Sequence, residues 1–429
     1  MTKKEEKKVQ IRLWNANLKV RLFGEGLFNL LFWMYFPFIT VYFGNVLGPK
    51  AAGLLMTVPP LFALAGSLLG GALADRLGRR VVMLLGTALQ AVMFACFALS
   101  PSRWLDYLAF IGIGLGGAVY KPASSAMVAD LVPAAERRGV FATFMTAHNV
   151  GAVLGPALGA VFFFQYRQEL LWTCAAVMLG YGIALYLIVE ETLPARQSKA
   201  EPPEKSSILR AFKEQLNGYA VIFRDPVFRI YTLAGICALI PIMQLDLYVA
   251  VYLTDEVPAQ RLFHWLADSP VLSGTKLYGW LLGWNGLLFV LFILPMSKRL
   301  GKWKERDVFL LSCLLSGVGT FALGLGTNFW FLFLMTTVFT FGEIVRSPVT
   351  QSFISRYAPE QARGQYMGAD SLQATAAKFA APLTVTLSGW LEPLWIFGII
   401  LLLAALGAAL YFRLFQLFPE PQTEQQAEK

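Results

Sequence analysis

Charged residues are scarce in this sequence. They make up 15% of its 429 residues, whereas a soluble domain carries about 25%. The four cysteines lie singly in separate apolar runs, which excludes a disulfide-rich secreted scaffold, and the only histidines are His148 and His264. No HExxH, GxSxG or GxxxxGK[ST] motif occurs. These absences exclude an ATP-driven pump in a single chain and argue against an enzyme, and we expect neither a metal nor a cofactor.

The apolar residues, 56% of the chain, gather in long runs. A helix that crosses a bilayer needs about 20 apolar residues. Twelve runs reach this length, so the predicted fold class is an all-α membrane protein with twelve transmembrane helices. The predicted spans are residues 22–43, 51–73, 81–100, 104–131, 139–164, 170–189, 228–253, 277–296, 308–326, 328–354, 365–390 and 393–416.

Lysine and arginine are distributed unevenly between the predicted loops. One alternate set of connections holds the charged N-terminal segment, the segment 191–227 and most of the short basic clusters. The other set holds little more than Lys50, Arg103, Arg167 and Arg261. Because cytoplasmic loops are the basic ones, both termini are predicted in the cytoplasm of a multi-pass protein of the cell (plasma) membrane. The net charge of +9 then reflects this topology, and no nucleic-acid partner is expected.

The two halves of the chain carry matching fragments. Residues 117–121 (GAVYK) pair with 342–346 (GEIVR), and residues 75–79 (DRLGR) pair with 298–302 (KRLGK). Such matches predict a duplicated six-helix unit, an architecture typical of secondary transporters. The predicted organisation is an N-terminal half 1–190, a cytoplasmic linker 191–227, a C-terminal half 228–417 and a cytoplasmic tail 418–429, with the two halves pseudo-symmetric.

Two local sequences resemble motifs of the major facilitator superfamily. The stretch 71–80 (GALADRLGRR) is similar to the superfamily's signature loop, and 151–160 (GAVLGPALGA) is similar to its antiporter motif, GxxxGPxxGG. The resemblance, to the drug/proton antiporter type, covers the whole chain. It implies alternating access and drug export driven by protons. Many antiporters of this family also carry an arginine in span four, which the stretch 109–114 lacks.

The signature loop is expected at the cytoplasmic membrane edge. There Asp75 can bond an arginine or a helix N-terminus across the two halves and act as a gate; simple positive-inside anchoring is the alternative for the basic residues. Asp130 and the cluster 136–138 are expected in the same charge network, with anchoring and gating equally open. The residues assigned to gating are Gly71, Asp75, Arg76, Gly78, Arg79, Arg80 and Asp130.

Two acidic residues lie deep inside predicted spans: Asp246 in span seven and Glu343 in span ten. A carboxylate in a membrane is expensive and usually faces the interior of the bundle. It can take up a proton on one side and release it on the other, so we expect these residues to couple transport to protons and to attract cationic substrates. A static pair between Glu343 and Arg346, one turn away, is the alternative.

Other polar residues within the spans are weaker candidates. Glu25 either lines the pocket or pairs with Arg21 at the interface, and His148 either carries a proton or is a packing residue. Asp370 lies on one face of span eleven with Gln373, and Lys378 lies off that face. The proton-coupling and substrate group therefore comprises Asp246, Glu343, Glu25, His148 and Asp370. Lys121 and Arg346 occupy matching positions in the two halves and either bridge them or extend to the interface.

The glycines of span five recur every fourth residue. Gly151, Gly155 and Gly159 line one helix face, where small residues allow a second helix to approach closely, and Pro156 bends the helix. The contact either seals the path against proton leak or serves packing alone.

The predicted function is a monomeric secondary transporter that exchanges protons for a small lipophilic, cationic substrate across the lipid bilayer. Transport of a lipid-linked compound, a siderophore or a metabolite is the alternative.

Overall fold

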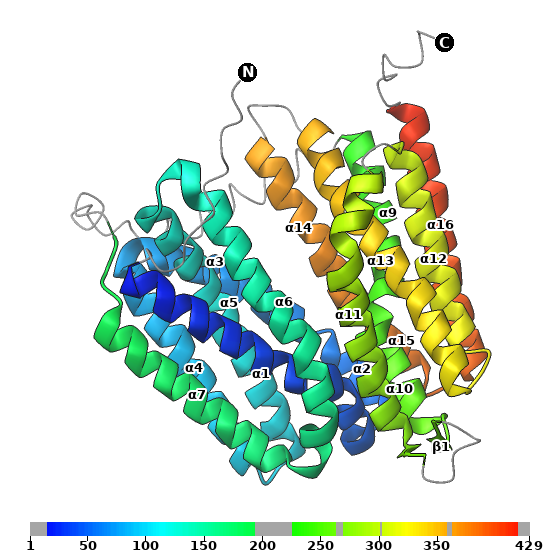
Figure 1. The fold of residues 1–429 in the computed structure, drawn as a ribbon, viewed down its shortest axis with the longest axis horizontal. Coiled ribbons are helices and arrows are strands. Elements are labelled where there is room, and N and C mark those ends of the chain that lie inside the picture. The colour runs from blue at the N-terminus through cyan, green and yellow to red at the C-terminus, as the bar shows by residue number, and fades with distance from the viewer. Residues whose placement is uncertain (1–14, 194–224, 263–268, 301–302, 358–362, 419–429) are drawn as a thin grey trace. The chain divides into compact units, whose positions relative to one another are not determined.

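The computed structural model describes residues 15–193, 225–262, 269–300, 303–357 and 363–418. Nearly all of this part of the chain is helical (Figure 1). The linker residues 194–224 and the tail residues 419–429 lie outside the described residues. The chain forms two compact units. Unit 1 comprises residues 1–36 and 58–204, and unit 2 comprises residues 37–57 and 205–429.

Seven of the described helices lie in unit 1 or in the segment 37–57, which belongs to unit 2. They are α1 (Ala16–Leu47), α2 (Pro49–Met56), α3 (Pro59–Leu77), α4 (Arg79–Leu99), α5 (Arg103–Leu131), α6 (Ala134–Gln165) and α7 (Arg167–Ile188). Within unit 1, α4 packs on α5 and α7, and α3 packs on α5. Glycines allow this approach: a Cβ on Gly86 would lie 2.7 Å from the carbonyl oxygen of Gly116. Small residues are common where membrane helices meet closely.

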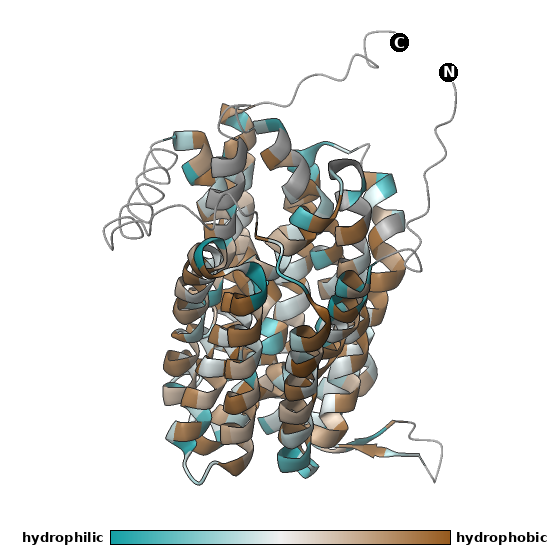
Figure 2. Cartoon of the chain, turned by 90° about the vertical axis from the view of Figure 1, so that its left-hand side faces the viewer, coloured by the Kyte–Doolittle hydropathy of each residue, from teal (hydrophilic) through white to brown (hydrophobic). Residues whose placement is uncertain are grey.

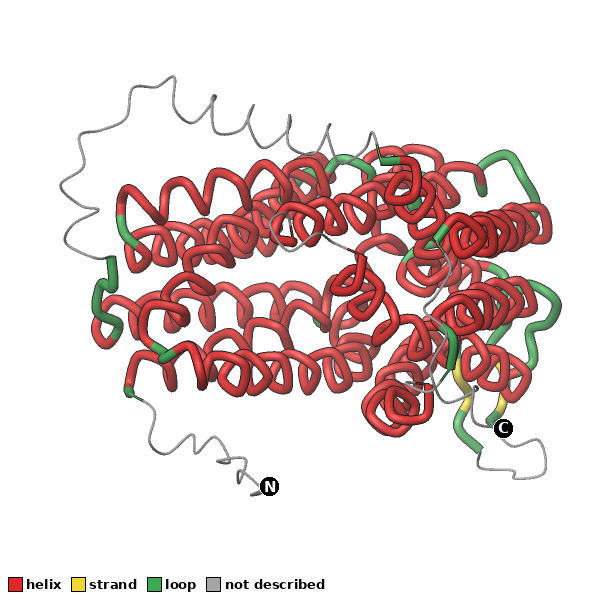
Figure 3. Tube along the Cα trace, turned by 90° about the horizontal axis from the view of Figure 1, so that it is seen from above, coloured by secondary structure: helices red, strands yellow, loops and turns green. Residues whose placement is uncertain are grey.

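Unit 2 contains the remaining elements of the described chain: α9 (Pro226–Ile242), the 3₁₀ turn η2 (Met243–Asp246), α10 (Tyr248–Asp255), β1 (Gln260–Arg261), β2 (Val271–Leu272), α11 (Gly274–Leu300), α12 (Glu305–Leu323), α13 (Phe329–Tyr357), α14 (Arg363–Ala380), α15 (Leu383–Leu387) and α16 (Pro393–Leu417). The two short strands pair antiparallel (Figure 3). α12 packs on α13 and α16, and α9 packs on α14 and α16.

The boundary between the units falls inside α1. Residues 16–36 of this helix belong to unit 1, and residues 37–47 pack with unit 2, as does α2, which contacts α15. Pro37 marks the change, since proline removes a backbone hydrogen bond and weakens the helix locally. The division into halves 1–190 and 228–417 stays a prediction, and the compact units differ from it by the segment 37–57.

Ten helical segments of the described chain are long and apolar enough to cross a membrane, by length and composition. Hydrophobic residues run along the helices (Figure 2). The two other predicted spans, 104–131 and 365–390, coincide with α5 and with α14–α15. α14 is rich in polar residues, among them Asp370, Gln373 and Lys378. Polar residues within membrane helices usually face the interior of the bundle or a water-filled cavity.

Candidate functional site

Predicted span seven is broken where it carries its acidic residue. Pro241 is the last residue but one of α9, and the 3₁₀ turn η2 follows, ending at Asp246 before the chain resumes as α10. Leu247 at the break has φ −120° and ψ −102°, outside the helical region. Non-helical backbone at membrane depth is tolerated only where it is buried in protein or lines a cavity, and discontinuous helices form substrate and ion sites in transporters.

The break is held by hydrogen bonds to other elements of unit 2. The Thr40 hydroxyl donates to the Asp246 carbonyl oxygen at 3.2 Å, and the Thr384 hydroxyl of α15 donates to the Gln244 side-chain oxygen at 2.8 Å. The Asp246 carboxyl group is half-buried and lies within electrostatic reach of Tyr278 and of Glu343. The two acidic residues predicted from the sequence therefore influence each other electrostatically, although Asp246 does not line the cavity beside Glu343 described below.

Glu343 projects from α13 toward α11. The amide nitrogen of Asn285 donates to its carboxylate at 3.1 Å and to the Thr340 hydroxyl at 3.0 Å. The salt bridges of the described residues include none between Glu343 and Arg346. This carboxylate is therefore held by a neutral amide rather than by a cation, and it can take up or release a proton without breaking an ion pair.

A cavity of about 320 Å³ opens beside Glu343. Arg346, Asp370 and Gln373 also line it. Two hydroxyl side chains and four apolar ones complete its wall: Ser347, Thr350, Leu239, Ile242, Phe289 and Ala374. The Tyr231 hydroxyl donates to Asp370 at 2.9 Å. As the helical spacing predicts, Asp370 and Gln373 share one face and line the cavity, while Lys378 is exposed and does not line it. The wall thus carries two carboxylates and one arginine among hydroxyl, amide and apolar side chains, and the carboxylates give it groups that can bind a cation.

Arg346 is buried, with 5% of its surface exposed. Its guanidinium group donates to the Gln373 side-chain oxygen at 3.0 Å and lies over the rings of Phe309 and Tyr411, 5.7 Å and 5.6 Å from their centres. The arginine is therefore enclosed within unit 2, where it also lines the cavity beside Glu343. Lys121, at the matching position of the first half, is exposed on α5. The paired role predicted for these two residues as an inter-half bridge stays a prediction.

Unit 1 holds a second buried polar group around Glu25. Its Oε1 atom accepts hydrogen bonds from the hydroxyl groups of Tyr120, at 2.9 Å, and Ser124, and lies 3.4 Å from Arg21. Its Oε2 atom lies 3.7 Å from Nε2 of His148. Arg21 is only 1% exposed and also donates to the Ser124 carbonyl oxygen at 2.7 Å. Glu25 is thus an interior acid that is also paired with Arg21, and His148 is its neighbour.

Arg79 organises the signature loop within unit 1. Its Nε atom lies 3.1 Å from Asp130, its Nη2 atom lies 3.2 Å from Asp75, and its Nη1 atom donates to the Ala74 carbonyl oxygen. The carboxylate of Glu191, which follows α7, accepts hydrogen bonds from the backbone N–H groups of Arg79 and Arg80 at 2.9 and 3.0 Å. Gly78, with φ +100°, allows this approach, because a Cβ there would lie 2.2 Å from the Glu191 carboxylate.

The carboxylates around Arg79 differ in burial, which predicts different costs of neutralising them. The Asp130 side chain is 25% exposed and also accepts from the Thr192 hydroxyl, whereas that of Asp75 is 67% exposed. We expect Asp130→Asn to lower the free energy of unfolding by about 1 kcal/mol and Asp75→Asn by roughly 0.3 kcal/mol. Denaturation of the two purified variants in detergent checks this order; equal losses would contradict it.

The glycines of the antiporter motif pack α6 against α1. A Cβ on Gly151 would lie 2.6 Å from the backbone nitrogen of Leu30, and a Cβ on Gly155 would lie 2.4 Å from Cβ of Trp33. Gly159 is buried, and Pro156 lies inside the helix. The close approach predicted for this helix face is therefore present within unit 1. The role of the motif in sealing the path against proton leak stays a prediction.

A methyl group added at Gly155 is expected to push α6 away from α1. Overpacking of this kind costs about 1–3 kcal/mol, so Gly155→Ala should lower the thermal unfolding midpoint measured in detergent. Gly180→Ala is the matched control, because this glycine of α7 is exposed and a Cβ there would meet nothing within 4 Å. Equal midpoints for the two variants would show that the α1–α6 contact is not tight.

Several members of these sites were not among the residues predicted from the sequence. They are Tyr120, Ser124 and Tyr181 around Glu25, Asn285 and Thr340 at Glu343, Tyr231 at Asp370, and Glu191 at the signature loop. The sequence could have identified Asn285 as a site residue, since an amide inside an apolar span needs a hydrogen-bond partner. The hydroxyl groups carried no such signal, because serine, threonine and tyrosine are common in membrane helices for other reasons.

Comparison of the chain with models of known protein families identifies its family. The model of the Major Facilitator Superfamily matches residues 22–257 and 271–429. The chain belongs to the Major Facilitator Superfamily. The resemblance predicted from the signature loop and the antiporter motif is thereby confirmed, as is the all-α membrane fold.

The chain is also similar to individual transport proteins. The chain is 37% identical over 416 residues to a Na⁺, Li⁺, K⁺/H⁺ antiporter of Planococcus maritimus, with 96% of this chain and 98% of that protein covered. It is 29% identical over 380 residues to the multidrug resistance protein MdtH of Cronobacter sakazakii, with 86% and 85% covered. A solved structure of a POT family transporter in complex with 5-aminolevulinic acid has a TM-score of 0.77 and covers 96% of this chain and 98% of its own, but it is 18% identical and supports the fold alone.

As a superfamily member, this chain is a multi-pass membrane transporter and not an enzyme. Its relatives include an ion/proton antiporter and a multidrug resistance protein. The chain therefore transports a small-molecule or ionic substrate. Any functional role of the buried carboxylates is a role in this transport.

Proposed function

We propose that this chain is a proton-coupled antiporter that exports lipophilic cations by alternating access. The observation that carries the proposal is the cavity in unit 2 with Glu343 and Asp370 in its wall. A carboxylate within the membrane is retained for function, because its burial opposes folding. Here it lies beside a cavity with both polar and apolar walls that is large enough for part of an organic molecule.

The geometry supports exchange rather than cotransport. A cation that binds Glu343 competes with a proton for the same carboxylate, so proton uptake favours release of the cation. Asn285 holds the carboxylate by one hydrogen bond and leaves it free to change its protonation state. Asp246, within electrostatic reach at the break after α9, provides a second proton-carrying group, since the negative charge of one carboxylate disfavours ionisation of the other.

Unit 1 contributes a separate acidic group, Glu25 with His148. We assign it to the proton path rather than to substrate, because its carboxylate is already hydrogen-bonded to two hydroxyl groups and paired with Arg21. The proposed orientation places both termini in the cytoplasm of the cell membrane, following the basic loops, and the proposed functional unit is the monomer.

Exchange of alkali-metal cations for protons is the second candidate. It is supported by the 37% identity to the Na⁺, Li⁺, K⁺/H⁺ antiporter and by the hard oxygen atoms grouped near Glu343, the Thr340 hydroxyl and the Asp370 carboxylate. Both candidates use the same carboxylates and differ in the cation that competes with the proton.

Proton flux in everted membrane vesicles separates the two candidates. Vesicles containing the protein are acidified inside, and recovery of an acridine dye is followed after addition of NaCl, LiCl, KCl or ethidium. We expect ethidium to release protons from the lumen in proportion to the amount of protein. Release by the inorganic salts but not by ethidium would replace the first candidate with the second.

A further inference from the structure

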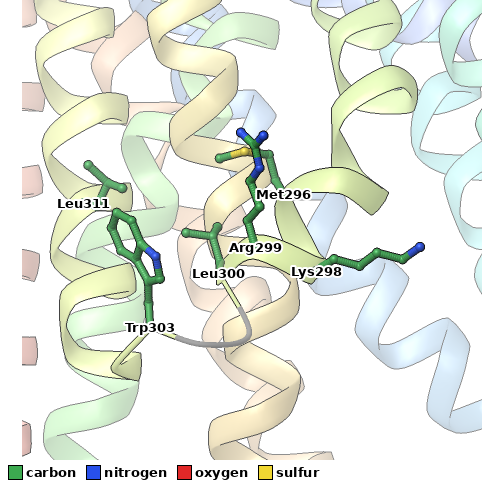
Figure 4. Close-up of a pocket in the computed structure, with 6 residues that line it drawn as sticks. All are labelled: Met296, Lys298, Arg299, Leu300, Trp303 and Leu311. Carbon is green, nitrogen blue, oxygen red and sulfur yellow. The ribbon is translucent and has the colours of Figure 1, made fainter.

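A second cavity, of about 460 Å³, lies at the end of α11 and outside the site described above. Figure 4 shows the six residues that line it: Met296, Lys298, Arg299, Leu300, Trp303 and Leu311. Four of them are apolar or aromatic. In the predicted topology this end of the helix is at the cytoplasmic side of the membrane, where the cavity combines two basic residues with four apolar or aromatic ones.

The basic residues of this cavity have no protein partner among the described residues. No hydrogen bond or salt bridge of the Arg299 guanidinium group or the Lys298 ammonium group occurs there, and both side chains are exposed. The acidic residues that follow in α12 are already engaged: Glu305 with Arg356 at 2.5 Å, and Asp307 with Arg306 at 2.8 Å.

The corresponding loop of the first half is neutralised from within the chain. There Arg79 has carboxylate partners in Asp75 and Asp130. In the repeat, Lys298 stands at the position of Asp75, so the sequence KRLGK carries only positive charge where DRLGR carries both signs. The second loop therefore lacks the internal anion that its counterpart has.

We propose that this cavity binds an anionic phospholipid of the cytoplasmic leaflet. Phosphate oxygen atoms of the headgroup accept from the Arg299 guanidinium group and from the indole N–H of Trp303, an aromatic residue of the kind that gathers at membrane interfaces. The upper part of an acyl chain contacts Met296, Leu300 and Leu311. A basic pocket between membrane helices at the cytoplasmic side is suited to anionic headgroups. This assignment is independent of which cation the transporter exchanges.

Figure 4 distinguishes the two basic side chains. Arg299 points the same way as Met296 and lies beside it, whereas Lys298 extends away from the other labelled residues. We therefore assign the headgroup contact to Arg299 and expect a smaller contribution from Lys298.

Native mass spectrometry of the purified full chain tests the proposal with phosphatidylglycerol and phosphatidylcholine of identical acyl chains. We expect the wild type to retain phosphatidylglycerol in preference to phosphatidylcholine. Arg299→Gln should lower retention of phosphatidylglycerol about fivefold, the size expected for one basic residue at an anionic membrane surface. Arg229→Gln is the matched control, because Arg229 is exposed at the start of α9 and does not line the cavity.

A second variant keeps every charge and fills the space. Leu311→Trp should also lower retention of phosphatidylglycerol, because the larger ring occupies the volume assigned to the acyl chain. Equal retention of the two lipids by the wild type would overturn the proposal. Equal losses in Arg299→Gln and Arg229→Gln would also overturn it, since they would show attraction to overall positive charge and not a site at this cavity.

Discussion

Glu343→Gln is expected to abolish proton-driven exchange while the protein still folds and reaches the membrane. Glutamine can keep the hydrogen bond with Asn285 and nearly the same volume, but it cannot carry a proton or a negative charge. Substrate flux driven by a pH gradient should fall to the level of liposomes without protein. Uptake of a fluorescent cation into proteoliposomes measures this loss.

The matched control is Glu256→Gln, the same chemical change at an exposed residue after α10, and it should transport normally. Asp246→Asn tests the other member of the proposed pair, and we expect it to lower coupled flux as well. Normal pH-driven flux in Glu343→Gln would remove this carboxylate from the coupling mechanism and transfer the proposal to Asp246, Asp370 or Glu25.

Arg21→Gln is expected to have the largest effect on stability. Arg21 is 1% exposed and is the cation beside the half-buried Glu25 carboxylate. Removing one partner of a buried ion pair costs about 3–5 kcal/mol, because the other charge stays buried without compensation. The free energy of unfolding, measured in mixed micelles with increasing denaturing detergent, should fall by this amount.

The double variant Arg21→Gln, Glu25→Gln shows whether the loss comes from the unpaired carboxylate. It should recover part of the stability lost in the single variant, since neutral amides can hydrogen-bond to Tyr120 and Ser124 without a buried charge. The single variant Glu25→Gln completes the comparison. If the loss in the double variant equals the sum of the losses in Arg21→Gln and Glu25→Gln, the two groups do not interact.

The fold could be predicted from the sequence because its main signal is the length of the apolar runs. Each of the twelve predicted runs coincides with a helix or helix pair of the described chain. The exceptions are local. The break at η2 interrupts a run whose hydropathy is continuous, and only Pro241 indicated it. The strands β1 and β2 have two residues each, too few for the alternation that identifies a strand.

The site could be predicted in part, and the limit is physical. The sequence identified four acidic residues, because an acidic side chain inside a membrane span is costly and usually has a function. They are Asp246, Glu343, Glu25 and Asp370. Their partners come from other helices, as with Asn285 of α11 and Tyr231 of α9, and the sequence does not record which helix faces meet. The same limit applies to Glu191, whose contact with Arg79 joins positions 112 residues apart.

The most direct test of the proposed mechanism is the flux of ethidium into proteoliposomes under an imposed pH gradient, for the wild type and for Glu343→Gln. We expect uptake by the wild type that follows the size and the sign of the gradient, and none by the variant. Ethidium flux that is independent of the gradient, or equal in the two proteins, would contradict proton-coupled exchange at Glu343.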